Sequence, residues 1–260
     1  MMLEPLQYAL GAVSGSLVGF ILGLIGGGGS ILAVPLMVYL VGVPNPHIAI
    51  GTSALAVAVN AGINLIAHAR TRAVKWQCAS IYAAAGMIGA YFGSSAGKVF
   101  DGHRLLFLFA LLMIAVGVLM LRKRSDSGNP DVECQRHNAP KVIVYGSMTG
   151  LFSGFFGIGG GFLIVPGLIA ATGMPMINAI GSSLVAVTVF GFTTAINYAA
   201  SGLVDWPLAV VFIAGGIAGG IAGIFASRRL YTRKGALNLV FSGMIFMVAA
   251  YIIFDFITKP

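Results

Sequence analysis

A run of glycines set inside apolar sequence and closed by a proline occurs twice in this chain. Residues 26–35 read Gly-Gly-Gly-Gly-Ser-Ile-Leu-Ala-Val-Pro, and residues 157–166 read Gly-Ile-Gly-Gly-Gly-Phe-Leu-Ile-Val-Pro. Each glycine costs a helix about 1 kcal/mol relative to alanine, so these runs predict a break between apolar helical stretches. Irregular backbone at membrane depth survives only where protein or a water-filled cavity surrounds it. Matching breaks in two halves of a chain indicate where a transporter binds its substrate.

The composition requires a membrane. Of 260 residues, 58% are hydrophobic and 8% are charged, against about 25% charged in an ordinary soluble domain. The net charge of +8 comes from Lys and Arg at the ends of apolar stretches, where such residues orient a membrane protein. We therefore expect a lipid bilayer as partner and no nucleic acid.

The glycine motif belongs to a longer internal repeat. Residues 15–35 and 146–166 match at 10 of 21 positions, and residues 51–76 and 181–206 match at 9 of 26. The repeat predicts an all-α polytopic protein with two halves, residues 1–121 and 142–260, joined by a polar linker at 122–141. In each half we expect a glycine-broken segment of two short helices and three spanning helices. The expected spans are 48–69, 77–97 and 105–121, then 178–200, 207–227 and 235–257.

The distribution of basic residues predicts that the halves are inverted. If each broken segment returns to its starting side, 12 of the 15 Lys and Arg fall on one side of the membrane and 3 on the other. If each broken segment crosses once, the split is 9 to 6. Basic residues favour the cytoplasmic side, so we expect inverted repeats and a cytoplasmic linker.

The ionisable residues give no support to an enzyme. No Asp or Glu occurs between Glu4 and Asp101, which leaves no acid pair for catalysis and no carboxylate relay of the kind that proton pumps use. Cys78 and Cys134 have no metal-ligand spacing, and we expect free thiols on the basic side. No catalytic residue, metal or cofactor is expected.

The glycine breaks are the first candidate site. Free backbone N–H groups there, with the helix dipoles of the segments that follow, favour an anion. Close helix packing is the alternative reason for these glycines. The candidate binding residues are Gly27, Gly28, Gly29, Ser30, Gly159, Gly160 and Gly161.

A line of neutral polar residues is the second candidate. Asn60, Asn64 and His68 share one helix face. In the repeat, Thr194 and Tyr198 of the second half align with Asn64 and His68, and Asn197 lies nearby in the sequence. These donors suit an oxyanion, and polar contacts between helices are the alternative. Hydroxyls at the start of the same spans can contact substrate, cap the helices, or do both: Thr52, Ser53, Ser182 and Ser183.

The two Gly-rich motifs, the Gly-Thr-Ser and Gly-Ser-Ser starts at residues 51–53 and 181–183, and the paired Trp76 and Trp206 resemble one known family. The chain is similar to the TauE/SafE sulfite exporters, also called the 4-toluene sulfonate uptake permease family. The resemblance covers residues 10–255 and implies an inner-membrane protein of bacteria or archaea that moves sulfur-containing or organic anions. We expect a secondary transporter that exports sulfite or a small organosulfonate by alternating access. A passive anion channel and a permease for another small organic anion remain alternatives, and the oligomeric state stays open.

Overall fold

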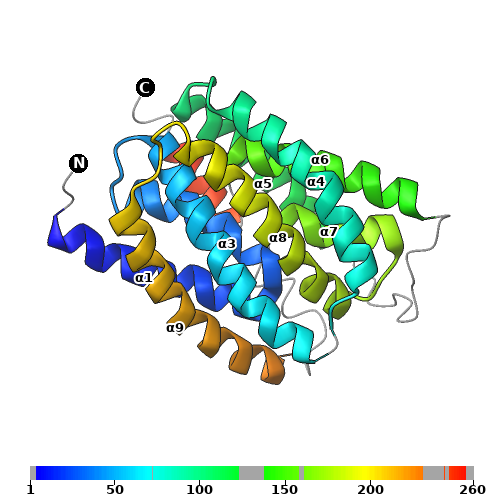
Figure 1. Cartoon of the computed structure of the whole chain (residues 1–260). Helices are drawn as coiled ribbons and strands as arrows, with labels where there is room; N and C mark the ends of the chain where they lie inside the picture. Colours follow the sequence, from blue (N-terminus) through cyan, green and yellow to red (C-terminus); the bar gives the residue numbers. More distant parts are fainter. Residues whose placement is uncertain are drawn as a thin grey trace.

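The computed structural model describes residues 4–71, 73–122, 138–157, 161–230, 243 and 246–255, and the secondary structure in these ranges is helical (Figure 1). The polar linker therefore lies mostly outside the described residues. The elements are α1 (Pro5–Ile25), η1 (Gly26–Leu32), α2 (Ala33–Pro35), η2 (Leu36–Leu40), α3 (Pro46–Arg70), α4 (Trp76–Gly97), α5 (Gly102–Arg122), α6 (Ala139–Phe156), α7 (Gly161–Thr172), α8 (Met176–Ala199) and α9 (Trp206–Leu230). A further helical stretch covers residues 246–255.

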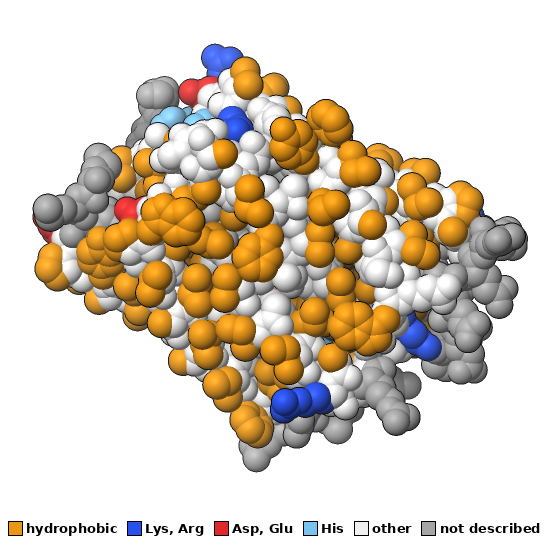
Figure 2. Space-filling model, in the orientation of Figure 1, with side chains coloured by type: hydrophobic (Ala, Val, Ile, Leu, Met, Phe, Trp, Pro, Cys, Tyr) orange, Lys and Arg blue, Asp and Glu red, His pale blue; other side chains and the backbone are white. Residues whose placement is uncertain are grey.

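Four of the described helices are long and apolar enough to cross a membrane: α1, α3, α8 and α9. Figure 2 shows hydrophobic side chains over the middle of the visible face and Lys and Arg toward its ends. A multi-pass membrane protein accounts for both observations. One expectation needs correction, because α1 has 21 residues and is not a short half-helix. Only the returning part of the first broken segment, residues 26–40, consists of short helices.

The first glycine run reverses the chain direction. Gly26 has φ +71°, a conformation open to glycine and costly for other residues. The chain then continues through η1, α2 and η2, and Val41 comes to lie beside the start of α1, where the Gln7 Nε2 donates to its carbonyl at 3.2 Å. The segment thus begins and ends at the same end of α1. In the second half Gly157 has φ +67° at the end of α6, while residues 158–160 are outside the described ranges.

Glycines set the packing of two parallel helix pairs, α1 with α9 and α4 with α6, at opposite sides of the bundle (Figure 1). A Cβ added at Gly19 of α1 would lie 2.6 Å from the Cα of Gly216 in α9. A Cβ added at Gly150 of α6 would lie 2.6 Å from the Cα of Gly86 in α4. The small residues on these helices, among them Gly15, Gly19 and Gly23 at intervals of four in α1, therefore bring helix backbones into contact.

Helices α3 and α8 lie between these pairs and run antiparallel. Gly51, near the start of α3, lies beside Tyr198, near the end of α8, and Gly191 of α8 lies beside Ala58 of α3. Each of the two helices also contacts one glycine-packed pair, α3 through α9 and α8 through α4. The centre of the bundle is thus formed by the two helices that carry the polar candidate residues.

The state of Cys78 differs from the expectation of a free thiol. Cys78, in the first turn of α4, is buried and forms a disulfide bond. The chain has one other cysteine, Cys134, which lies outside the described residues. Sequence spacing could not anticipate this bond, because pairing depends on how the chain brings distant segments together.

Candidate functional site

The two broken segments meet inside the bundle. The Gly27 N–H donates to the Ser183 Oγ at 3.2 Å, and the Gly161 N–H donates to the Ser30 Oγ at 3.2 Å. Glycine is required at this crossing, because a Cβ on Gly161 would collide with the Gly27 backbone. We call these four buried residues the glycine–serine cluster. It joins η1 to α7 and α8, and so brings together candidate residues from both halves of the sequence.

Each serine of the glycine–serine cluster both accepts and donates. The Ser30 hydroxyl donates to the Gly27 carbonyl at 3.0 Å, and the Ser183 hydroxyl donates to the Ile180 carbonyl at 2.7 Å. The two hydroxyl oxygens therefore accept from the Gly27 and Gly161 N–H groups, and both N–H groups are paired in this structure.

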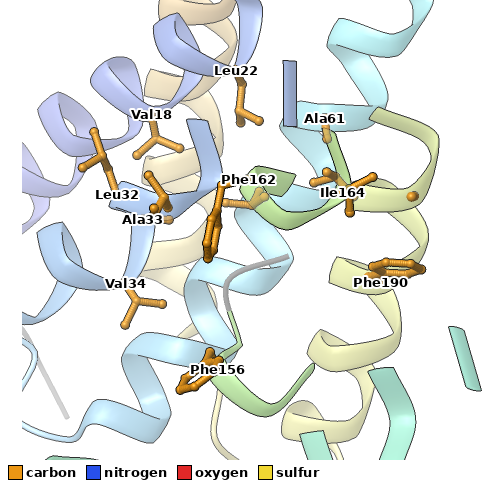
Figure 3. Close-up of a cluster of buried hydrophobic side chains, with 14 of the residues drawn as sticks. Val18, Leu22, Leu32, Ala33, Val34, Ala61, Phe156, Phe162, Ile164 and Phe190 are labelled. Atoms are coloured by element: carbon orange, nitrogen blue, oxygen red, sulfur yellow. The ribbon is translucent and has the colours of Figure 1, made fainter. Parts of the chain in front are cut away.

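Apolar side chains surround the glycine–serine cluster. Figure 3 shows Leu32 and Ala33 of the first broken segment next to Val18 of α1, with Phe162 of α7 beside Ala33. Phe162 and Ala33 are fully buried. Hydrogen bonds to backbone N–H groups are stronger in such a water-poor setting, and unpaired polar groups are more costly. The N–H and hydroxyl groups of the cluster, and the Gly27 and Ile180 carbonyls that accept from the serines, are thus held in apolar surroundings.

The other glycines of the first run have different roles. Gly28 and Gly29 are buried in η1. A Cβ on Gly29 would lie 2.7 Å from the Ile21 carbonyl carbon, so this glycine lets η1 pack on α1. Gly159 and Gly160 lie outside the described residues.

Thr52 and Ser182 form two matching bonds between the halves. The Thr52 Oγ1 accepts from the Asp205 N–H at 2.9 Å, and the Ser182 Oγ accepts from the Lys75 N–H at 2.9 Å. Each bond joins the early part of a central helix to the chain just before α9 or α4. These hydroxyls therefore connect the loops that precede α9 and α4 to the opposite half.

The expectation that these hydroxyls cap helices is wrong. Helix α3 begins at Pro46 with Asn45 as its N-cap, and α8 begins at Met176 after Pro175. Proline fixes φ near the helical value and suits a helix start, so both helices begin earlier than expected. Ser53 lies within α3, where its hydroxyl donates to the Ile50 carbonyl at 3.1 Å.

Asn60, Asn64 and His68 are buried on one face of α3, as expected. They face the helix pair α1–α9: a Cβ on Gly220 would lie 3.0 Å from the Asn64 Oδ1. The Asn64 Nδ2 donates to the Asn60 carbonyl at 2.9 Å, whereas the Asn60 amide and the His68 Nε2 have no hydrogen-bond partner among the described residues. Unpaired buried polar groups of this kind need a functional or structural explanation. The ring of His68 also lies within hydrogen-bonding reach of the Gly23 backbone, three residues before the first glycine break.

The α8 residues expected to match this line divide between two environments. Thr194 and Tyr198 are fully buried, and their hydroxyls have no hydrogen-bond partner among the described residues. Asn197 points elsewhere, and its Nδ2 donates to the Ser94 Oγ at 2.6 Å and the Ser95 Oγ at 2.9 Å. It is therefore separate from the glycine–serine cluster.

Sequence reasoning missed Lys98, which forms a polar cluster with Asn197 and Ser201. Its Nζ donates to the Asn197 Oδ1 at 2.8 Å and to the Ser201 Oγ at 2.8 Å, and it lies 5.9 Å from the centre of the Tyr198 ring. In the sequence Lys98 only opens a short polar loop after an apolar stretch. The one signal available in the sequence was that no other Lys or Arg occurs in residues 76–103.

Comparisons with known proteins agree with the fold. The family model described as sulfite exporter TauE/SafE matches residues 11–252. A probable membrane transporter protein of Xylella fastidiosa (strain 9a5c) is 55% identical, covering 92% of this chain and 92% of that protein. The probable membrane transporter protein YunE of Bacillus subtilis (strain 168) is 24% identical, covering 96% of this chain and 98% of that protein. No solved structure matches the chain significantly.

The family match spans both broken segments and the central helices α3 and α8. The all-helical bundle, the apolar surface and the curated relatives all indicate a membrane transporter. This chain belongs to the TauE/SafE sulfite exporter family of membrane transporters.

Proposed function

We propose that this protein is a secondary transporter that carries a small sulfur-containing oxyanion, sulfite or a small organosulfonate, through a site at the glycine–serine cluster. The observation that carries the proposal is the meeting of the two broken segments through Gly27, Ser30, Gly161 and Ser183. Transporters bind substrate where broken helices of the two halves meet.

The chemistry of the cluster supports an anion. Its donors are backbone N–H groups and hydroxyls, and α7 begins at Gly161, so the positive end of its dipole points into the cluster. The absence of Asp and Glu between Glu4 and Asp101 removes the groups that would repel an anion from this half. A permease for another small organic anion would need the same donors and differs from our proposal only in the substrate.

Alternating access would follow from two inverted repeats, residues 1–121 and 142–260, that rock against each other around the cluster. The matching bonds Thr52 to Asp205 and Ser182 to Lys75 support a two-fold relation between the halves. The antiparallel arrangement of α3 and α8, which are equivalent in the repeat, supports inversion. The return of the first broken segment to Gln7 is what the inverted topology requires.

The orientation in the bacterial inner membrane is proposed from charge. Placing the 122–141 linker in the cytoplasm puts 12 of 15 Lys and Arg on that side, in accord with the preference of basic loops for the cytoplasm. Cys78 lies on the same side, so its disulfide would be reduced in the cell. Export agrees with the family description, and a potential negative inside assists anion efflux by about 2.3 kcal/mol per charge per 100 mV.

Counterflow of labelled sulfite into proteoliposomes tests the proposal, with sulfoacetate, taurine and sulfate as competitors. We expect saturable counterflow that Ser30→Ala and Ser183→Ala reduce at least tenfold, since each removes a donor to a buried anion, worth about 1.5–3 kcal/mol. Ser80→Ala is the matched control, because the Ser80 hydroxyl is exposed and bonds only within α4.

Three results would separate the alternatives. Flux that does not saturate and shows no counterflow would identify a passive anion channel. Counterflow of a competitor but not of sulfite would be compatible with the glycine–serine cluster as the site and would reject sulfite as the substrate. Equal counterflow by Ser183→Ala and Ser80→Ala would reject the glycine–serine cluster as the site.

A further inference from the structure

A groove runs along the outer surface between α4 and α8, away from the glycine–serine cluster. Its volume is about 520 Å³, and it is lined chiefly by Met87, Ile88, Tyr91, Thr193 and Ile196, with Asn197 at one end. The apolar lining residues are well exposed: Met87 46%, Ile88 61%, Tyr91 54% and Ile196 68%. In a membrane protein such a surface contacts acyl chains, so the groove offers a shaped contact for one of them.

The end of the groove at Asn197 is polar and carries a positive charge. The Lys98 Nζ is held there by the Asn197 carbonyl at 3.1 Å, the Asn197 Oδ1 and the Ser201 Oγ. Ser94 and Ser95 bond the other side of the Asn197 amide. All of these partners are neutral, and no carboxylate in the described part of the chain pairs with Lys98. The charge is therefore fixed in position but not neutralised.

The spacing along α4 matches one leaflet of a bilayer. Ile88 and Lys98 are ten residues apart, which corresponds to about 15 Å of helix. Half of the hydrocarbon core is also about 15 Å thick. With Lys98 at the end of α4, where the polar loop begins, the groove extends from headgroup level to about the middle of the membrane.

We propose that this groove binds one anionic glycerophospholipid, with an acyl chain along Met87, Ile88 and Ile196 and the phosphate at Lys98. Ser201 is exposed, so a phosphate oxygen can replace its hydroxyl at the Lys98 ammonium. The exchange adds the attraction between the phosphate charge and the ammonium, which the neutral Ser201 hydroxyl does not offer. The site is independent of the proposed substrate and of the glycine–serine cluster.

The contact would also give the lipid a route to influence transport. Lys98 and Asn197 connect the end of α4 to the end of α8, and Tyr198, whose ring lies next to Lys98, is packed against Gly51 of α3. A bound phosphate would strengthen this link between a helix of the first half and a helix of the second. Relative movement of the halves would then depend on the lipid.

Native mass spectrometry of the purified full-length protein tests the proposal, with phosphatidylglycerol and phosphatidylcholine of identical acyl chains added at equal concentration. We expect one phosphatidylglycerol to be retained in preference to phosphatidylcholine. Lys98→Gln should reduce its retention about fivefold, as expected for the loss of one lysine at the surface of an anionic membrane. Lys98→Arg should preserve retention, and Lys75→Gln, a lysine at the opposite end of α4, should leave it unchanged.

A second variant tests the apolar part without a change of charge. Thr193→Phe would fill the groove and should also reduce phosphatidylglycerol retention. Equal retention of the two lipids by the unmodified protein would overturn the proposal, whatever the variants do. Detection of a dimer whose formation Thr193→Phe abolishes would also overturn it, because the groove would then be a contact between two copies of the chain.

Discussion

Replacing Gly19 by alanine tests the close packing of α1 on α9. A Cβ at this position would lie 2.6 Å from the Cα of Gly216, and ordinary contacts begin at 3.4 Å. Because the neighbour is backbone, and the Gly216 carbonyl oxygen lies closer still than its Cα, the two helices must separate by more than about 0.8 Å. Overpacking of this kind costs about 1–3 kcal/mol, and we expect the upper end because backbone cannot change rotamer. Alanine recovers about 1 kcal/mol of helix propensity, so Gly19→Ala should lose about 2 kcal/mol of stability.

Gly62→Ala in α3 is the matched control. A Cβ there would lie 3.6 Å from the Thr188 Cγ2, an ordinary contact, so only the propensity gain of about 1 kcal/mol remains. The two variants should thus differ by about 3 kcal/mol. For a chain of this size 1 kcal/mol corresponds to roughly 2–4 °C in Tm, which gives a gap of about 6–12 °C. Gly150→Ala, the equivalent position in α6, should behave like Gly19→Ala because it faces the Gly86 backbone.

The assay is thermal unfolding of the detergent-solubilised protein, followed by tryptophan fluorescence and by the fraction that stays monodisperse after heating. The order expected is Gly62→Ala above wild type, then Gly19→Ala and Gly150→Ala together below it. If Gly19→Ala unfolded at the same temperature as Gly62→Ala, the close approach of α1 and α9 would be refuted.

Two further predictions concern the polar residues. Thr52→Val and Ser182→Ala each leave a backbone N–H, of Asp205 or Lys75, without its acceptor; each should cost about 1–3 kcal/mol, and the two variants should lower the apparent Tm by similar amounts in the same unfolding assay. A much larger effect of one than of the other would contradict the equivalence of the two bonds. Tyr198→Phe removes a buried hydroxyl that has no partner among the described residues, so the Tm should stay the same or rise, while sulfite counterflow should slow if this hydroxyl contacts substrate during transport. Unchanged counterflow would assign Tyr198 to packing alone.

Several features of the fold follow from the sequence because they depend on local pattern. The small charge content and the long apolar stretches require a membrane protein, since only internally hydrogen-bonded helices or closed barrels tolerate lipid. The glycine runs predict breaks in the helices, and the structure has positive φ at Gly26 and Gly157. The stripe that includes Gly15, Gly19 and Gly23 predicts close helix contact, and its partner α9 supplies backbone at each of these positions.

The candidate site was only partly predictable. The sequence names Ser30 and Ser183 as candidates, Ser30 from the first glycine motif and Ser183 from the Gly-Ser-Ser start of the second central span. It does not reveal that each accepts from a glycine N–H far away in the sequence. The same limit explains the error about Thr52 and Ser182. Their hydroxyls accept from backbone N–H groups of a distant loop, not from N–H groups at the start of their own helices.

The sequence by itself determined that the chain lies in a lipid bilayer, that it is helical, that it contains a repeat and where its helices break. These properties depend on hydropathy and on backbone preferences, which act within a few residues. Only the tertiary structure decided which helices pair, that Asn197 binds Lys98 and lies apart from the glycine–serine cluster, and that Cys78 forms a disulfide. Such contacts join residues far apart in the sequence, 99 positions for Lys98 and Asn197, and the pairing of helices depends on how close glycine allows their backbones to come.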